Sequence, residues 1–372
     1  MTINQLTNNL LIAILEIIIA LFLGIVIAFL GLGSVAWIFG GMGAGLIVVK
    51  SYQTISKKTL TQNKTSRKIG QAMVGLSIGF AIADSNFLAA SSRLPLFIFL
   101  SFFMFFCGSV IGYFYSRISH TNLLNAMLAT VPGGVATMSS IAAEYNRNVS
   151  LVAMVQTLRI TSVILIIPLV AGTSETLANK TTFSLEDYLI KSDPIYLCIL
   201  SLAIFAAWLG VFISRKLRIP AASFFGTLIV GIVFNYAISY ILLIPDFNFT
   251  PPQAISVIGQ ILLGITVGEA WSSRVGITRK NVTHAFISVG MTIISGFIAA
   301  IIATLVTSWD WITCMLMTAP GGSTEMILIA LALDHNPEIV TIAHSVRLMA
   351  LNLSLPLWIF LFQYWDNKTT GY

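Results

Sequence analysis

Long apolar runs separated by short polar stretches fill this sequence from end to end. Two further segments, 122–146 and 311–335, are apolar but are each interrupted by Pro-Gly-Gly. Proline removes a backbone donor and glycine weakens a helix, so both segments are predicted to break at that point. Ten uninterrupted runs predict spanning helices, five in each half: 10–31, 34–49, 69–83, 94–116, 150–171, 194–214, 219–243, 255–271, 284–308 and 338–363.

The two interrupted segments are copies of one unit. Residues 130–134 read Thr-Val-Pro-Gly-Gly, residues 318–322 read Thr-Ala-Pro-Gly-Gly 188 positions later, and a methionine and an arginine follow both at the same spacing. An upstream Gly-Gln-x₃-Gly-x₃-Gly pattern at 70–79 recurs at 259–268. We therefore predict a first membrane repeat, a polar linker and a second membrane repeat, at 1–172, 173–193 and 194–372.

Composition supports a membrane location. Charged residues make up 9% of the chain and hydrophobic residues 57%, which is typical of an all-α transmembrane protein surrounded by a lipid bilayer. Lysine and arginine lie mainly in the short loops, so the basic balance indicates topology and no nucleic-acid partner. The three cysteines, Cys107, Cys198 and Cys314, are far apart in sequence, and neither a disulfide, a metal site nor a cofactor is predicted.

The loop charges also predict how the halves are oriented. We place the chain in a plasma membrane, with the N-terminus and the loop 50–68 in the cytoplasm. If both interrupted segments return to their side of entry, 15 basic residues lie inside and 3 outside; if both cross, the split is 10 to 8. The positive-inside rule favours the first count, which inverts the second repeat relative to the first. A broken helix that spans, with a different short helix left out, gives the same parity.

The paired breaks are the first candidate site for a substrate or an ion. Interrupted backbone within a membrane is tolerated where it is buried in protein or lines a wet cavity, and inverted repeats with broken helices are typical of secondary transporters. A new helix start offers amide donors that suit an anionic or polar solute. An ordinary helix-turn-helix is the alternative. The break residues of this site are Pro132, Gly133, Gly134, Pro320, Gly321 and Gly322.

Two arginines within apolar runs are the second candidate. Arg159 and Arg347 each follow their break by the same interval, and charge at such depth normally faces a bundle interior and has a partner. Glu325 lies three residues past the second break, where the first copy has Thr137. Glu325 is either a proton-coupling acid opposite an anion-binding arginine, or half of a structural ion pair.

Polar residues near these positions enlarge the predicted binding region, although each of them could equally serve helix contacts. Glu269, at the end of a short glycine-rich helix, is expected to be solvated, and Glu16 is an isolated acid in the first apolar run. The added binding residues are Thr137, Gln156, Ser323, His344, Gln71 and Gln260.

These motifs together resemble the AbrB family of bacterial membrane proteins. The resemblance rests on the duplicated Gly-Gln-x₃-Gly-x₃-Gly helix, the two Pro-Gly-Gly breaks and the arginine in the last helix of each repeat, and it covers nearly the whole chain. In that family the second break usually reads Ala-Pro-Gly-Gly-x-x-Glu-Met, as at 319–326 here. The second helix of family members tends to contain Leu-Gly-Pro, whereas this chain has Phe-Gly-Gly at 39–41 and Phe-Gly-Thr at 225–227.

The resemblance implies a transporter-like architecture related to cation/proton antiporters and anion transporters, although family members have been labelled as regulators of gene expression and as ammonia monooxygenases. We interpret the chain as an ion- or proton-coupled secondary transporter of a small polar or anionic solute, and a homo-oligomer is compatible with this. A membrane sensor that affects gene expression through partners is the alternative. A monooxygenase is disfavoured because the four histidines are dispersed, with none paired at helical spacing.

Overall fold

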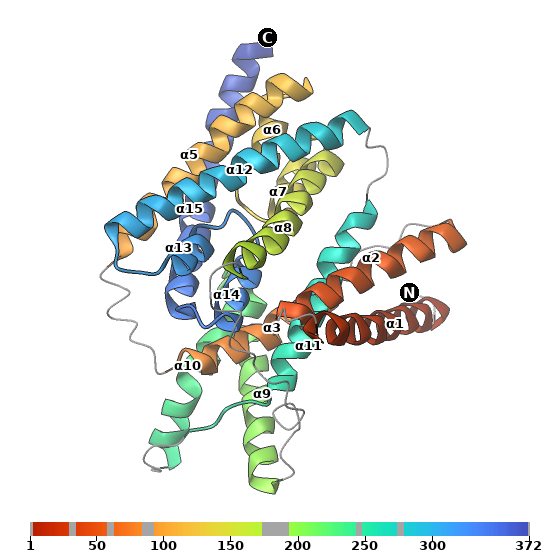
Figure 1. The fold of residues 1–372 in the computed structure, drawn as a ribbon, viewed down its shortest axis with the longest axis vertical. Helices are drawn as coiled ribbons and strands as arrows, with labels where there is room; N and C mark the ends of the chain where they lie inside the picture. Colours follow the sequence, from red (N-terminus) through yellow and green to blue (C-terminus); the bar gives the residue numbers. More distant parts are fainter. Residues whose placement is uncertain are drawn as a thin grey trace. The chain divides into compact units, whose positions relative to one another are not determined.

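The computed structural model describes two compact units, and each unit combines a part of both predicted repeats (Figure 1). The first unit comprises 1–85 and 174–272, and the second comprises 86–173 and 273–372. The predicted linker 173–193 lies outside the described residues, apart from Asp193. The described residues are 3–29, 35–57, 63–83, 93–172, 193–242, 248–273 and 279–370.

Helices make up both units. The first unit contains α1 (Ile3–Ile27), α2 (Ala36–Ser56), α3 (Lys64–Ala81), α9 (Pro194–Lys216), α10 (Ala222–Leu242) and α11 (Gln253–Glu269). The second contains α5 (Leu94–Ser119), α6 (Leu123–Thr130), α7 (Val135–Glu144), α8 (Val149–Gly172), α12 (Arg279–Val306), α13 (Trp311–Thr318), α14 (Ser323–Ala332) and α15 (Pro337–Thr370).

These helices confirm the fold class. Each of the ten predicted apolar runs corresponds to one helix, and each interrupted segment forms two short helices on either side of its break. Six of the described helices, α5, α8, α9, α10, α12 and α15, are long and apolar enough to cross a bilayer by length and composition. The described part of the chain is thus an all-α, multi-pass membrane protein.

In the first unit, the equivalent helices α3 and α11 cross in opposite directions. Gly70 faces Leu262 and Leu263 of α11, whereas Gly259 faces Met73 and Val74 of α3. Residues later on one helix therefore meet residues earlier on the other. α3 contacts α11 in the same way as α11 contacts α3, as a two-fold axis perpendicular to the helices requires. The two repeats are therefore inverted within this unit.

In the same unit, helices of one repeat pack against helices of the other. α2 of the first repeat packs against α11 of the second, and α10 packs against α3 in the equivalent way. The backbones approach closely because both surfaces carry glycine: a Cβ at Gly41 would lie 3.1 Å from Gly264 Cα, and one at Gly79 would lie 2.9 Å from Gly231 Cα. At Gly41, the missing side chain allows α11 to pack closely against α2.

We expect Gly264→Ala to destabilise the first unit. A Cβ on Gly264 would overlap the carbonyl oxygen of Ile38 and lie 2.9 Å from Met42 N, and backbone atoms cannot move aside as a flexible side chain can. Overpacking of this kind costs on the order of 1–3 kcal/mol. Thermal unfolding of the purified protein in detergent measures the loss.

Gly290→Ala is the matched control. Gly290 lies within α12, and nothing is within 4 Å of the position of its Cβ. Alanine is the better helix former by about 1 kcal/mol, so this variant should unfold at the same temperature as wild type or higher. Equal losses from both substitutions would contradict the close packing of α2 on α11.

In the second unit, the equivalent helices α5 and α12 also run in opposite directions, side by side in Figure 1. The ring of Phe97, near the start of α5, stacks on Trp309, just past the end of α12, with centroids 5.6 Å apart. The start of one helix therefore lies beside the end of its counterpart. Both units thus have inverted repeats.

The second interrupted segment folds back on itself. Asp310 caps the start of α13, and His335 and Asn336 follow the end of α14. His335 Nδ1 lies 2.9 Å from Asp310 Oδ2, and Asn336 Nδ2 donates to Asp310 Oδ1 at 3.1 Å. The two ends of the segment are adjacent, so it is a hairpin that enters and leaves on the same side.

The first interrupted segment has the same form. Gln156 donates to Leu128 O and Arg159 to Thr130 O, so α8 runs parallel to α6. α7 joins the end of α6 to the start of α8 and must run back along them. The loop charges predicted this return, and the described chain does not adopt the alternative of a broken helix that crosses.

The Asp310–His335 contact predicts how the second hairpin responds to pH. Burial acts to raise the pKa of the Asp310 carboxyl, but two hydrogen bonds from Thr313 and the charge of His335 outweigh it, so the pKa lies below its ordinary value. A depressed carboxyl pKa stabilises the fold above the unfolded pKa of about 3.9 and ceases to do so as the pH falls through the folded value.

We expect Asp310→Asn to lower the unfolding temperature at neutral pH, because asparagine keeps the helix cap and removes the charge. The difference from wild type should narrow as the pH falls below about 4. Asp193→Asn is the control, since Asp193 caps α9 by accepting from Ile195 N, whereas Asp310 also accepts from Thr313 Oγ1 and contacts His335. A difference that stayed constant from neutral to acidic pH would show that the charge of Asp310 does not matter.

Candidate functional site

The candidate site is built on the tips of the two hairpins, defined as residues 130–134 and 318–322. Each tip ends in a glycine with positive φ, +80° at Gly134 and +40° at Gly322, a conformation that other residues adopt at a cost. Pro132 and Pro320 are buried just before these glycines. The Pro-Gly-Gly sequence therefore ends one short helix, turns the chain and starts the next.

Arg159 holds the first tip from α8. It is 2% exposed, and its Nη1 donates to Thr130 O at 2.8 Å while Nη2 donates to Gln156 Oε1 at 2.6 Å. Gln156 in turn donates to Leu128 O and Val131 O. The break leaves carbonyl groups without helical partners, and these two side chains supply the donors.

Arg347 holds the second tip from α15 in the equivalent way. Its Nη1 donates to Ala319 O at 2.7 Å, and its Nη2 contacts His344 Nδ1. His344 Nε2 lies 3.0 Å from Leu316 O, the counterpart of Leu128 O. The repeated spacing predicted these four side chains at the breaks, and the structure assigns them to the carbonyl groups of the tips.

Threonine and glycine complete each tip, although neither was predicted as a site residue. Thr130 Oγ1 donates to Gly108 O at 2.9 Å, and Thr318 Oγ1 donates to Gly296 O at 3.1 Å. The two threonines are 188 residues apart, and so are the two glycines, as the breaks are. This repeated spacing was the available signal, and the hydrogen bonds fix each tip to the long helix before it.

Both tips contact the same stretch of α8. Gln156 and Arg159 bind the first tip, and a Cβ at Gly321 of the second tip would lie 3.5 Å from Ile160 Cα. Arg159 and Arg347, which each donate to a carbonyl group of one tip, are both buried. Arg159 Nε is buried and has no hydrogen-bond partner within the described residues. Two buried positive groups, one with a spare donor, therefore lie at the tips.

Glu325 turns back over the second tip. Glu325 Oε2 lies 2.7 Å from where a Cβ on Gly322 would be, and Gly322 is the N-cap of α14. A glutamate at the third helical position normally reaches back to the start of its helix, where the carboxylate is also favoured by the helix dipole. Its carboxylate is therefore placed at the helix start, and Thr137, its counterpart at the first tip, is exposed.

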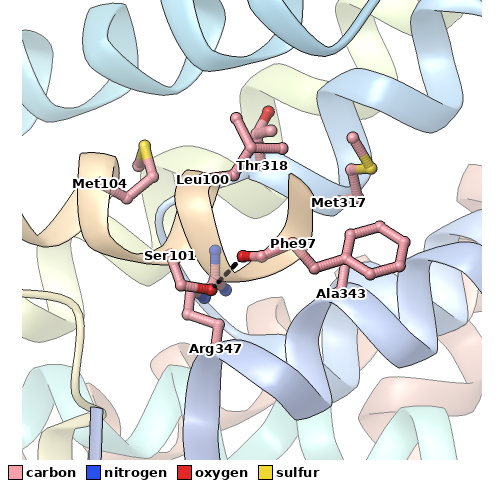
Figure 2. Close-up of a pocket in the computed structure, with 8 residues that line it drawn as sticks. All are labelled: Phe97, Leu100, Ser101, Met104, Met317, Thr318, Ala343 and Arg347. Carbon is pink, nitrogen blue, oxygen red and sulfur yellow. Dashed lines mark hydrogen bonds between the residues drawn. The ribbon is translucent and has the colours of Figure 1, made fainter. Parts of the chain in front are cut away.

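A small cavity adjoins Arg347, and Figure 2 shows the side chains around it. About 10 Å³ is open to a water molecule, which is at the lower limit for holding one. Ser101 of α5 lines it and donates to Phe97 O at 2.7 Å. Its counterpart at position 289 is valine, so the repeat gave no signal for Ser101. The cavity is lined by Phe97, Leu100, Ser101, Met104, Met317, Thr318, Ala343 and Arg347.

The remaining predicted residues divide between the units. Ser323 is half-buried at the start of α14, beside the second tip. Gln71 on α3 and Gln260 on α11 belong to the first unit, not to the unit that carries the tips. Gln260 is 4% exposed and donates to Ser256 Oγ at 3.3 Å. Glu269 was expected to be solvated, and this was wrong, because it is 1% exposed.

Comparison with known proteins agrees with this architecture. The model of a protein family described as "Transition state regulatory protein AbrB" matches residues 37–363, which is most of the chain. The chain belongs to the AbrB family. This AbrB-family protein is similar to "Uncharacterized protein YhjN" of Bacillus subtilis (strain 168), at 25% identity over 79% of this chain and 78% of the relative.

A second relative is "Putative regulator AbrB" of Escherichia coli (strain K12), which is 21% identical over 86% of this chain and 88% of its own length. No solved structure matches the chain. The region that the family model matches includes both interrupted segments and both arginines.

Proposed function

We propose that this AbrB-family protein is a secondary transporter of a small anionic or polar solute, which it moves unchanged and without a cofactor. The observation that carries the proposal is the pair of buried guanidinium groups at the tips of two inverted hairpins. Positive charges buried in a low-dielectric region are costly. A bound anion at the tips would offset that cost, and Arg159 Nε is an available donor.

The inverted hairpins support transport over simple binding. Alternating access needs a site that two equivalent elements can open in turn, and inverted repeats supply such elements. Here the tips have equivalent arginine contacts but unequal side chains, with Glu325 at one and Thr137 at the other. This difference gives the proposed site a carboxyl group at one tip, which suits coupling to a proton or an ion.

A ligand screen followed by a flux assay tests the proposal. Purified protein in lipid nanodiscs is heated with small carboxylates, amino acids and inorganic anions, and we expect an anion to raise the unfolding temperature. The same compound, radiolabelled, should then exchange across proteoliposomes that contain the protein. Stabilisation without exchange would indicate a membrane sensor, a reading that fits the name of the E. coli relative.

The inner-membrane orientation is also part of this proposal. With the loop 50–68 in the cytoplasm, the inverted repeats place the linker and the loop after α11 on opposite sides. Single cysteines at Ser174 and Thr278, in a variant that lacks the native cysteines, should react with an impermeant maleimide from opposite faces of the cell membrane. Reaction of both from the same face would rule out this topology.

A further inference from the structure

Two buried carboxyl groups lie together in the first unit, away from the hairpin tips. Glu16 is midway along α1 and 2% exposed, and Glu269 is the last residue of α11 and 1% exposed. The helices that carry the two groups, α1 and α11, are in contact. The transport site proposed above uses neither of them.

Small residues of α2 make room for this pair. A Cβ at Gly45 would lie 3.1 Å from Glu269 N, which places the end of α11 against α2. α1 runs antiparallel to α2, because a Cβ at Gly40 would lie 2.6 Å from Ala20 O, while one at Gly24 would meet the ring of Trp37. A residue one turn before Ala20 on α1 is therefore level with a residue about one turn after Gly40 on α2. Glu16 is thus level with Gly45 and with Glu269.

The surroundings of the pair are apolar. Na⁺ or another metal cation would require several oxygen ligands, and the side chains packed here offer hydrocarbon. A proton needs only the two carboxyl groups, since neighbouring carboxylates in an apolar site cannot both be ionised. The hydrophobic cluster consists of Ala20, Trp37, Ala44, Val257, Ile261 and Ile265, with Ile17 and Ile19 packed against it.

The two carboxyl groups differ in their hydrogen bonds. Glu269 Oε2 accepts from Asn63 N at 2.9 Å, and Asn63 is the N-cap of α3, where the helix dipole favours a negative charge. Glu16 Oε1 is buried without a hydrogen-bond partner in the part of the chain that the structure describes. The negative charge is therefore favoured on Glu269, and the proton on Glu16.

Basic groups on the neighbouring helices are directed elsewhere. On α2, Lys50 is exposed, and Tyr52 and Lys57 lie beyond it towards the end of the helix. On the first turns of α3, Lys64 and Lys68 are exposed and Arg67 is half-buried. Among the described residues of α1 and α11, the two glutamates are the titratable groups.

The repeat provides an internal comparison. When the two halves of the unit are aligned on the glycines that make close helix contacts, Glu16 corresponds to Leu202 on α9 and Glu269 corresponds to Phe80 on α3. The equivalent half of the unit packs Phe80 in a hydrophobic cluster with Leu200 and Phe234. Because the fold forms that half without acids, the acid pair is not a requirement of packing.

We propose that Glu16 and Glu269 form a proton-binding site that carries one proton at neutral pH, held on Glu16. The role of this proton as the coupling ion rests on the transport function proposed above, whereas its binding does not. In that role, the pair in the first unit would bind a coupling proton additional to the one assigned to Glu325, and the tips of the second unit would bind the solute. The pair occurs in one copy, so one proton would move per cycle from this site.

Infrared spectroscopy of the purified protein tests the site without any solute. We expect wild type to show the carbonyl stretch of a protonated carboxylic acid at neutral pH, and Glu16→Gln to lose it. Glu269→Gln should shift the band, because the neighbour of the protonated group changes. Glu144→Gln, at an exposed acid of α7, should leave it unchanged. Survival of the band in Glu16→Gln, or its absence from wild type, would overturn the proposal.

Stability measurements without solute provide a second test of the proton-binding site, which does not depend on the infrared band. Ionising both buried carboxyls is costly, so the unfolding temperature of wild type should fall from mildly acidic to alkaline pH, and Glu16→Gln should lose part of this dependence. If NaCl stabilised wild type more than choline chloride at equal ionic strength, and Glu16→Gln abolished that difference, the site would hold a metal cation and the proton proposal would be wrong. A protein that passes both tests and transports nothing would refute transport and leave the proton site intact.

Discussion

Arg159→Met is expected to destabilise the protein more than the glycine and aspartate substitutions described above. Methionine fills part of the volume but leaves Thr130 O and Gln156 Oε1 buried without the donors that the guanidinium supplies. Each buried acceptor left without a donor costs about 1–3 kcal/mol. Removal of the buried charge itself removes a desolvation cost, which by itself would stabilise the fold. Because the acceptors remain when the charge is gone, we expect the net effect to be a loss of stability.

Thermal unfolding in detergent measures this loss, and Arg117→Met is the control. Arg117 is exposed near the end of α5 and donates to Tyr113 OH, so its removal should change stability by less than about 0.5 kcal/mol. If Arg159→Met were as stable as wild type, the guanidinium would cost as much as it contributes to the fold. Its burial would then need another reason, and binding of a solute anion would be that reason.

Arg347→Met should behave similarly but with a smaller loss. Ala319 O also accepts from Gly321 N at 2.9 Å, so it keeps one donor when the arginine is removed. This difference between equivalent arginines follows from the local turn at the second tip, and the sequence repeat alone would have predicted equal effects.

The sequence predicted the long helices and the breaks because their signals are local. An apolar run of sufficient length indicates a spanning helix wherever it occurs, and the Pro-Gly-Gly at Pro132 or Pro320 interrupts a helix through its own backbone chemistry. Loop charges added the direction of return, because they depend only on which side each loop occupies. These two signals favoured hairpins but left open a broken helix that crosses, and the contacts at the ends of the segments decide between the two.

Tertiary partners were harder to predict. The arginines were expected to face an acid or a cavity. Arg347 does line a small cavity, but both arginines also donate to backbone carbonyls of the tips, which a sequence does not display as a pattern. The burial of Glu269 was missed because it depends on α2 and α3 meeting at the end of α11. That the compact units mix both repeats was also not predicted, since contact between distant helices leaves no local signal.

Glu325→Gln is expected to abolish pH-driven transport while leaving the protein folded. Glutamine at the third helical position can still reach back to the helix start, so the start of α14 over Gly322 should remain stable, and the substitution removes only the titrating charge. The measurement compares two assays in proteoliposomes, using the anion that stabilises the protein best. Accumulation driven by a pH gradient should be lost, and equilibrium exchange should continue.

Glu325→Ala separates charge from capping in the same pair of assays. Alanine removes both, so this variant should lose pH-driven accumulation and also unfold at a lower temperature, by an amount typical of a lost cap, on the order of 0.5–2 kcal/mol. If the glutamine variant accumulated solute normally and only the alanine variant failed, Glu325 would serve the helix start alone. Coupling would then have to come from elsewhere, and the carboxyl pair of the first unit is the group already placed to supply it.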